Sequence, residues 1–248
     1  MAATPAWPPK SAPRLFVAGP LREGASVAID GQQAHYLARV MRVAPGDAVV
    51  LCDDVTGEWA ARVASTGKRD VILSVETRLR PREEVPDLVL CAALLKKDRF
   101  DLVLEKACEL GVRRIQPVVA RRCVADKLNL DRARTILVEA AEQCARTALP
   151  ELAAPVTLDT LLSGAGEGRT LFFADETGGA PAAATYATNP GPAAILTGPE
   201  GGFDDSERTA IRALPSARPI SLGPRILRAE TAVVSAVALW QGAVGDWR

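Results

Sequence analysis

The pattern of apolar and polar positions changes about a third of the way along the chain. From residue 14 to residue 76 the apolar residues form short runs separated by turn residues such as Pro45 and Gly46, and only residues 35–41 have helical spacing. The runs predicted as strands cover residues 14–18, 25–29, 48–52, 58–63 and 70–76. Short strands this close together are typical of a small β-barrel or sandwich.

The rest of the chain alternates between buried strands and helices. Residues 87–95 are almost entirely apolar, and residues 98–110 carry apolar residues at helical spacing before a stop at Gly111. Further predicted strands cover residues 114–119, 171–174, 193–196 and 218–222, and another helix covers residues 131–146. This alternation predicts an α/β fold with a parallel sheet covered on both faces.

Three segments show neither the pattern of a strand nor that of a helix. Residues 1–13 are rich in Ala and Pro and lack the features of a signal peptide, so we expect a disordered leader. Residues 78–86 are charged, contain two prolines and are predicted to link two domains. Residues 177–192 look like a flexible connection. No apolar run reaches the length of a bilayer span, so we expect no membrane partner.

The last predicted helix begins near Glu230 or Thr231 and has almost no polar face. Residues 232–240 contain a single polar residue, Ser235. A helix that is apolar all round is buried on every side, but this one is short and rich in Ala for a membrane span. It is therefore predicted to pack inside a domain or against a second subunit.

Two glycine-containing loops precede helices near the end of the chain. The first, residues 197–202, follows a buried strand and leads to the helix-capping pair Asp204 and Glu207. The second begins at the Gly223-Pro224 turn. Glycine lets a ligand approach the backbone closely, so two such loops favour a shared pocket over two ordinary strand-to-helix turns. Neither loop has the pattern of a phosphate-binding or dinucleotide-binding motif, which argues against phosphate hydrolysis.

The same loops carry a family resemblance. LTGPEGGF (residues 196–203) and SLGPRILRAETA (residues 221–232) resemble SPOUT-class RNA methyltransferases, and more narrowly the ribosomal RNA small subunit methyltransferase E family. HYLARVMRVAPGD from His35, EKACELGVRRIQPVVARRC from Glu105 and EQCARTALPE from Glu142 extend the resemblance over nearly the whole chain. One departure is Ala145, where the family commonly has glycine.

The resemblance implies an activity and an architecture. The activity is N3-methylation of a uridine in the 16S rRNA of the 30S subunit, with S-adenosyl-L-methionine as the cofactor, by a cytoplasmic homodimer. The architecture is a PUA-like RNA-binding β-barrel at residues 14–77, a linker at 78–86, and a SPOUT domain at 87–248. A deep trefoil knot is expected at about residues 193–248, although knots are rare in proteins.

S-Adenosylmethionine requires an apolar slot with backbone hydrogen bonds, which the two loops can supply. The predicted cofactor-binding residues are Leu196, Thr197, Gly198, Pro199, Glu200, Gly201, Ser221, Leu222, Gly223, Ile226, Leu227, Thr231 and Ala232.

Charge is balanced overall, with 30 basic and 30 acidic residues, so the whole molecule is not a general polyanion binder. Residues 78–134, however, contain fourteen basic and nine acidic residues. Adjacent basic pairs such as Arg121-Arg122 suit a surface that binds RNA phosphates, and the alternative is an ordinary solvent-exposed charged face.

Arg14 falls where the family places an RNA-binding arginine, and a solvated arginine is the alternative. The predicted RNA-binding residues are Arg14, Arg39, Arg121, Arg122, Gln143, Arg146 and Arg225.

Methylation at N3 needs no cysteine nucleophile, because N3 has its own lone pair once its proton leaves. It needs a proton acceptor and a donor for the charge that develops on O2 or O4. We expect Arg228 to stabilise the uracil anion and orient Glu230, which accepts the proton directly or through water. The alternative is architectural, since an acid in the first turn also stabilises a helix.

The remaining reactive residues exclude other chemistry. Five dispersed cysteines without a CxxC pair are typical of reduced thiols in the cytosol and argue against disulfides or structural zinc. The single histidine, His35, excludes a histidine metal cluster, so no metal is expected.

Two other functions remain open from the sequence. One is a SPOUT enzyme that acts on a ribose 2′-hydroxyl or another base. The other is an rRNA-binding assembly factor with a vestigial pocket.

Overall fold

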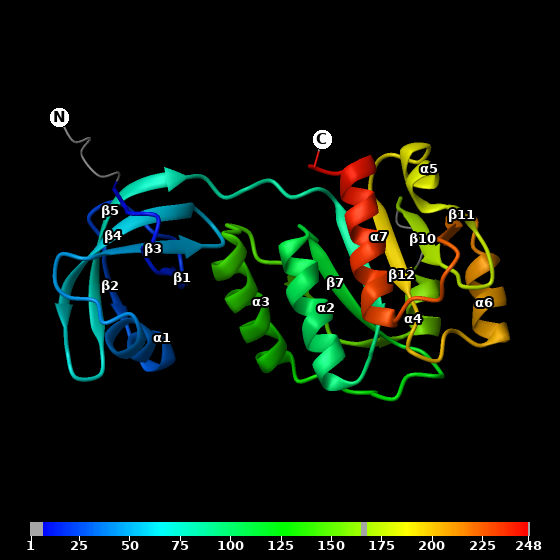
Figure 1. Cartoon of the computed structure of the whole chain (residues 1–248), viewed down its shortest axis with the longest axis horizontal. Helices are drawn as coiled ribbons and strands as arrows, with labels where there is room; N and C mark the ends of the chain where they lie inside the picture. Colours follow the sequence, from blue (N-terminus) through cyan, green and yellow to red (C-terminus); the bar gives the residue numbers. More distant parts are fainter. Residues whose placement is uncertain (1–6, 165–167, 248) are drawn as a thin grey trace. The chain divides into compact units, whose positions relative to one another are not determined.

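The computed structural model describes residues 7–164 and 168–247. The chain divides into two compact units (Figure 1). The first comprises Met1–Glu84 together with Ala141–Ala148, and the second comprises Val85–Ala140 and Leu149–Arg248. The return of residues 141–148 to the first unit was not predicted from the sequence.

The first unit is built on one five-stranded sheet in the order β1-β3-β4-β5-β2. The strands are β1 (Arg14–Phe16), β2 (Ser26–Ile29), β3 (Ala48–Asp53), β4 (Gly57–Thr66) and β5 (Val71–Arg80). β1 and β3 are parallel, and the other pairs are antiparallel. Within residues 7–164 and 168–247 no ladder joins β1 to β2, so the sheet is open where a closed barrel was expected.

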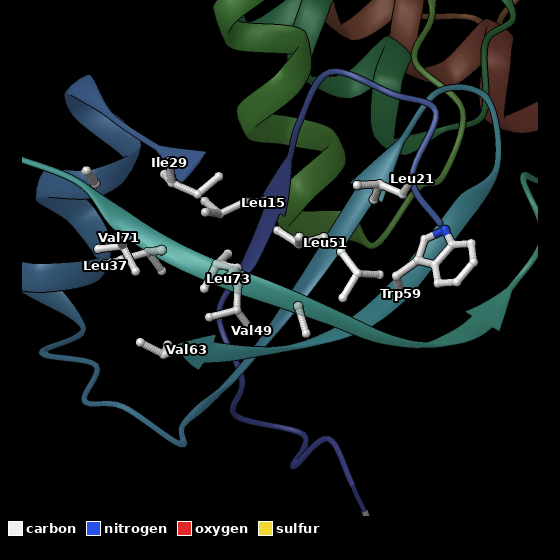
Figure 2. Close-up of a cluster of buried hydrophobic side chains, with 13 residues drawn as sticks. Leu15, Leu21, Ile29, Leu37, Val49, Leu51, Trp59, Val63, Val71 and Leu73 are labelled. Carbon is white, nitrogen blue, oxygen red and sulfur yellow. The ribbon is translucent and has the colours of Figure 1, made fainter. Parts of the chain in front are cut away.

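Alternating residues of these strands form the core of the first unit (Figure 2). Leu15, Val49 and Leu73 belong to it, with Leu37 from the helical segment beside the sheet. That segment begins earlier than predicted, as α1 (Gly31–His35), and continues as a π-helical turn, η1 (Tyr36–Val40). In β5 the buried residues Val71, Leu73 and Val75 alternate with more exposed ones, as in a half-buried strand, whereas all six residues of β3 are buried.

Trp7, within the predicted leader, is packed on the first unit. Residues 1–6 lie outside the described residues, but Trp7 packs on the guanidinium of Arg62, 3.9 Å from its ring centroid. The Trp7 indole also donates a hydrogen bond of 3.0 Å to Glu76. The expectation of disorder is therefore wrong at Trp7, which is held against β4 and β5.

The second unit contains an eight-stranded sheet in which every pairing is parallel. The order is β11-β13-β10-β12-β6-β7-β8, and β9 also pairs with β7. The strands are β6 (Leu88–Ala93), β7 (Arg114–Val119), β8 (Glu151–Leu152), β9 (Val156–Thr157), β10 (Thr170–Ala174), β11 (Ala180–Pro181), β12 (Ala193–Thr197) and β13 (Ala217–Ser221). The parallel sheet of an α/β fold is confirmed.

Helices cover both faces of this sheet, as predicted. They are α2 (Lys97–Glu109), α3 (Leu130–Cys144), α4 (Leu158–Ser163), α5 (Ala182–Ala187), α6 (Asp205–Arg212) and α7 (Ala229–Ala243). α7 contacts α2, α5 and β12, whereas α4 and α6 contact each other. The adjacent residues Phe172 and Phe173 point to opposite faces: Phe172 contacts Tyr186 of α5, and Phe173 joins the cluster that includes Leu158 and Ile211.

Three boundaries differ from the prediction. The helix predicted at residues 131–146 ends at Cys144, because Ala145 adopts a left-handed conformation with φ 64°. The connection predicted at 177–192 contains β11 and α5; α5 packs on α7, and its Tyr186 is buried against Phe172. The predicted linker is partly strand, because β5 continues to Arg80.

α7 is buried along one side only. Its buried residues include Val233, Ala236, Val237 and Trp240, whereas Leu239 is 40 % exposed. Burial on every side is therefore not achieved within one chain.

A search of residues 7–164 and 168–247 finds no helix long and apolar enough to cross a bilayer.

Candidate active site

A cavity of the second unit lies at the carboxyl ends of three neighbouring parallel strands, β13, β10 and β12. Its volume is about 420 Å³. Each strand ends in a loop that lines the cavity: residues 174–178 after β10, 197–203 after β12, and 221–229 after β13. Ligands of open α/β sheets characteristically bind at this edge of the sheet.

Both predicted loops line the cavity together. The predicted cofactor-binding residues that line it are Thr197, Gly198, Pro199, Glu200, Ser221, Leu222, Gly223, Ile226, Leu227 and Ala232. Three others do not. Leu196 is buried in β12, Thr231 is exposed on α7, and Gly201 lies against Arg122 instead.

Two glycines of the first loop are required by its geometry. A Cβ on Gly198 would lie 3.0 Å from the ring of Phe203. Gly202 has a φ of +66°, and a Cβ there would lie 2.5 Å from Oε1 of Glu176. Larger residues would therefore displace cavity-lining side chains or strain the loop.

The loop after β10 was missed by sequence analysis, which assigned only residues 177 and 178 of it to a flexible connection and left Asp175 and Glu176 unassigned. It places Asp175, Glu176 and Gly178 on the cavity. The signal that was available is the strand at residues 171–174 followed by Gly178-Gly179, the same arrangement that identified the other two loops.

Asp175 anchors this loop. Its carboxylate accepts hydrogen bonds from the backbone and hydroxyl groups of Thr177 at 2.9 and 2.8 Å, and from Nε of Arg212 at 3.0 Å. Burial alone would raise the pKa of Asp175, but the hydrogen bonds from Thr177 and Arg212 outweigh it and hold the pKa below its usual range. Asp175 is therefore a fixed anion at the base of the loop.

Glu230 has a different partner from the one predicted. Its carboxylate accepts two hydrogen bonds from Nη1 of Arg99 on α2, at 3.0 and 3.2 Å, so its observed partner is not Arg228. Arg99 lines the cavity, as do Arg228 and Arg225. Sequence reasoning did not single out Arg99.

Two residues predicted to bind RNA brace the loop after β12. Arg121 donates to Asp204 at 3.0 Å, and Arg122 donates to the carbonyl oxygen of Gly201 at 3.0 Å. The predicted capping box is confirmed, because Asp204 accepts from the Glu207 backbone and Glu207 accepts from the Asp204 backbone. The hydrogen bonds from the Glu207 backbone and Ser206 hold the pKa of Asp204 well below its usual range.

The remaining predicted RNA-binding residues lie in the first unit. Arg39 and Gln143 are exposed. Arg14 forms an ion pair with the buried Glu58, which also binds Arg80 at 2.6 Å. Arg146 is buried and contacts Glu83 at 3.1 Å. Arg14 is therefore not a solvated arginine, and these contacts give Arg14 and Arg146 architectural roles.

The cysteines do not contribute to the cavity. The five cysteines are free thiols, none of them lines the cavity, and burial raises the pKa of Cys91 to about 12. Among the residues described, no group of three or more His, Cys, Asp and Glu is arranged to hold a metal ion.

The cavity suits a ligand that is partly apolar and partly polar. Its walls combine Phe173, Phe203, Ile220 and Leu227 with the backbone of glycine-containing loops. A slot of this composition and volume fits the adenosine and methionine parts of S-adenosylmethionine.

Comparison with known proteins supports this interpretation. An RNA methyltransferase PUA domain model matches residues 29–76, and an RNA methyltransferase domain model matches residues 82–241. The ribosomal RNA small subunit methyltransferase E of Synechocystis is 33 % identical over 91 % of this chain and 76 % of its own. That of Rickettsia conorii is 27 % identical over 91 % of this chain and 93 % of its own.

Two solved structures with bound S-adenosylmethionine are similar over almost the full length. A ribosomal RNA small subunit methyltransferase E from Neisseria gonorrhoeae has a TM-score of 0.85 and 26 % identity, covering 96 % of this chain and 100 % of that chain. A methyltransferase from Legionella pneumophila has a TM-score of 0.86 and 29 % identity, covering 95 % of this chain and 99 % of that chain.

Proposed function

Because the chain belongs to the ribosomal RNA small subunit methyltransferase E family, we propose that it uses S-adenosylmethionine to methylate N3 of a uridine in 16S ribosomal RNA. The observation that carries this proposal is the cavity of about 420 Å³ at the carboxyl ends of β13, β10 and β12. It is formed by the loops that carry the family motifs. Structures similar over nearly the whole chain have S-adenosylmethionine bound.

The loops after β12 and β13 hold the cofactor in this proposal. Gly198 and Gly223 leave backbone groups accessible, while Leu222, Ile226 and Leu227 supply apolar contacts. When bound, S-adenosylmethionine supplies the methyl group: the lone pair of the deprotonated N3 forms the new bond, and the electron pair of the broken sulfur–methyl bond stays on the sulfur. Glu200, which accepts a hydrogen bond of 3.3 Å from the backbone of Lys96, fixes the loop beside α2.

Arg228 and Glu230 act on the uracil. Arg228 is exposed, lines the cavity and precedes α7, so it donates to an oxygen of the base. Glu230 accepts the proton that leaves N3. The charge that develops on O2 or O4 requires hydrogen-bond donors already in place.

RNA contacts involve both parts of the chain. Arg39 and Gln143 are exposed in the first unit, and Arg225 is exposed beside the cavity. Arg121 and Arg122 brace the loop after β12 and retain exposed side chains that can also meet phosphates. The first unit, which takes in residues 141–148 and all of β5, is the RNA-binding PUA-like domain, and the second unit is the catalytic SPOUT domain. The RNA is the 16S rRNA of the 30S subunit, and the enzyme acts in the cytoplasm.

The final part of the chain, about residues 193–248, forms a trefoil knot in this proposal. β13 lies beyond β10 in the sheet, yet α7, which follows it directly, packs on α2 and β12. The chain must therefore cross the ends of β10 and β12 to reach its last helix. This path supports a threaded topology of the SPOUT type.

Homodimerisation covers the open face of α7. Leu239 is 40 % exposed in a helix that has almost no polar side chains. A second copy of the chain provides the apolar surface that one chain lacks.

The test is methyl transfer from labelled S-adenosylmethionine to 30S subunits that lack the modification, followed by nucleoside analysis. We expect 3-methyluridine in the 16S rRNA. A 2′-O-methylated nucleoside or another methylated base would refute the N3 assignment. No labelling of 30S subunits or free 16S rRNA beside a working control enzyme, with rRNA binding retained, would instead indicate an assembly factor.

A further inference from the structure

Arg99 and Glu230 form an ion pair between two helices that are far apart in the sequence. Arg99 is the third residue of α2, and Glu230 is the second residue of α7. Nη1 of Arg99 donates to both carboxylate oxygens of Glu230, at 3.0 and 3.2 Å. The packing of α2 against α7 brings the two residues together.

The guanidinium is the member of the pair that reaches the cavity. Arg99 lines the cavity with a side chain 33 % exposed, whereas the Glu230 side chain is 13 % exposed. Among the described residues Nε and Nη2 of Arg99 donate to no protein acceptor, because both of its side-chain hydrogen bonds use Nη1. Three N–H groups of a guanidinium held in place thus remain for a ligand.

The pair offers a donor next to an acceptor. Each carboxylate oxygen of Glu230 has a second lone pair beyond the one that Arg99 occupies. The edge of uracil around N3 has the complementary order, a carbonyl oxygen acceptor beside the N3–H donor. Cytosine has the reverse order, an acceptor at N3 beside an amino donor.

We propose that Arg99 is a further catalytic and specificity-determining residue, which together with Glu230 binds the O–C–N3–H edge of the target uracil. This inference rests on the proposed function. Arg99 donates to the carbonyl oxygen, while the N3 proton moves to a carboxylate oxygen of Glu230, directly or through a water molecule, since Glu230 lies behind Arg99 and does not itself line the cavity. The electron pair of the N–H bond stays on the base, and the guanidinium faces the charge that develops on oxygen. Cytidine is rejected because both hydrogen bonds would be mismatched.

The test compares Arg99→Met with wild type in single-turnover methylation of 30S subunits at saturating cofactor. Loss of one donor to a developing oxyanion typically lowers the rate by about 10²–10³-fold, and we expect a loss in this range. The defect should shrink as the pH rises toward the pKa of the uracil imide, because the base then ionises without help. Calorimetry should show unchanged affinity for S-adenosylmethionine.

Arg132→Met is the matched control. Arg132 forms an ion pair with Asp101, also on α2, but does not line the cavity. The Arg132→Met enzyme should methylate 30S subunits at the wild-type rate at every pH. A wild-type rate for Arg99→Met, or a defect of the same size at every pH, would overturn the role of Arg99.

Because Arg99→Met leaves Glu230 without its partner, Arg99→Gln repeats the test with an N–H donor retained for the carboxylate. It should show the same pH-dependent defect, and a wild-type rate would overturn the proposal. Wild type run in parallel separates the two proposals. Absence of 3-methyluridine from the wild-type reaction counts against the proposed function. A normal rate in the Arg99 variants counts only against the role of Arg99 in binding the uracil edge.

Discussion

Nη1 of Arg122 donates a hydrogen bond of 3.0 Å to the carbonyl oxygen of Gly201, across 79 residues of sequence. The contact joins the segment after β7 to the loop after β12, which lines the cavity. The Arg122 side chain also lies 3.3 Å from where a Cβ on Gly201 would be. A residue predicted to bind RNA therefore restrains the loop proposed to bind the cofactor.

Arg122→Ala should weaken S-adenosylmethionine binding. The loss of one hydrogen bond from a charged donor to a partly exposed carbonyl costs about 1 kcal/mol, or roughly fivefold in Kd. Calorimetry with the cofactor alone measures it. Arg39→Ala, a change in the first unit, is the control and should leave cofactor affinity unchanged. If Arg122→Ala bound the cofactor normally, while the slope of log K for RNA binding against log salt concentration fell by about one, Arg122 would contact only phosphate.

Asp175→Asn should destabilise the protein by about 2 kcal/mol at neutral pH, because hydrogen bonds to a charged carboxylate are lost. The side chain of Asp175 is 1 % exposed, so solvent does not replace them. The pKa of Asp175 is lowered in the folded state. Its contribution is thus fully present above the ordinary carboxyl pKa of about 3.9 and disappears as the pH falls through the lowered value.

Denaturation by urea at a series of pH values measures this effect. The gap in stability between wild type and Asp175→Asn should be constant near neutral pH and close below about pH 4. Asp205→Asn is the control, because the side chain of Asp205 is fully exposed. A gap that persisted unchanged into strong acid would show that the charge of Asp175 is not the source of the stability.

Ala145→Gly should stabilise the first unit. The left-handed conformation costs an L-residue roughly 1–2 kcal/mol, and the extra freedom of glycine in the unfolded chain costs up to about 1 kcal/mol, so the net gain is about 0.5 kcal/mol. The urea midpoint should rise. Ala210→Gly in the exposed face of α6 is the opposite case and should lower stability by about 1 kcal/mol. A midpoint that fell in Ala145→Gly would show that the turn carries no strain.

Leu239→Arg should convert a dimer to a monomer, because it places a charge within the apolar face of α7. Sedimentation equilibrium distinguishes the two states. Val55→Arg changes an apolar residue of the first unit that is also exposed, and it should not alter the state of association. A monomeric wild-type protein would refute the proposed dimer directly.

The cavity could be located from the sequence only in part. Gly198 and Gly223 follow buried strands within distinctive motifs, so two of its three loops were recognisable. The third also has a strand followed by Gly178-Gly179, but its place between the other two loops required the position of β10 between β12 and β13, because adjacency in a sheet does not follow from order in the chain. Without that order, Asp175 and Glu176 belong to an ordinary connection.

Charged side chains were identified more easily than their partners. Arg121 and Arg122 form a basic pair in the sequence, but Asp204 and the carbonyl of Gly201 that they contact lie about eighty residues later. Glu230 was paired with Arg228 because the two are neighbours, whereas its partner Arg99 is 131 residues away. Contacts of this kind follow from helix packing and cannot be deduced from local pattern.

The return of Ala141–Ala148 to the first unit has a consequence for synthesis. The Glu83 carboxylate accepts hydrogen bonds from the backbones of Thr147 and Ala148 and from the side chain of Arg146. A ribosome makes these partners only after β6, α2 and β7 of the second unit. The first unit therefore cannot complete its contacts before much of the second has been translated, although domains generally fold in order as they are made. No single cut of the chain yields both units intact.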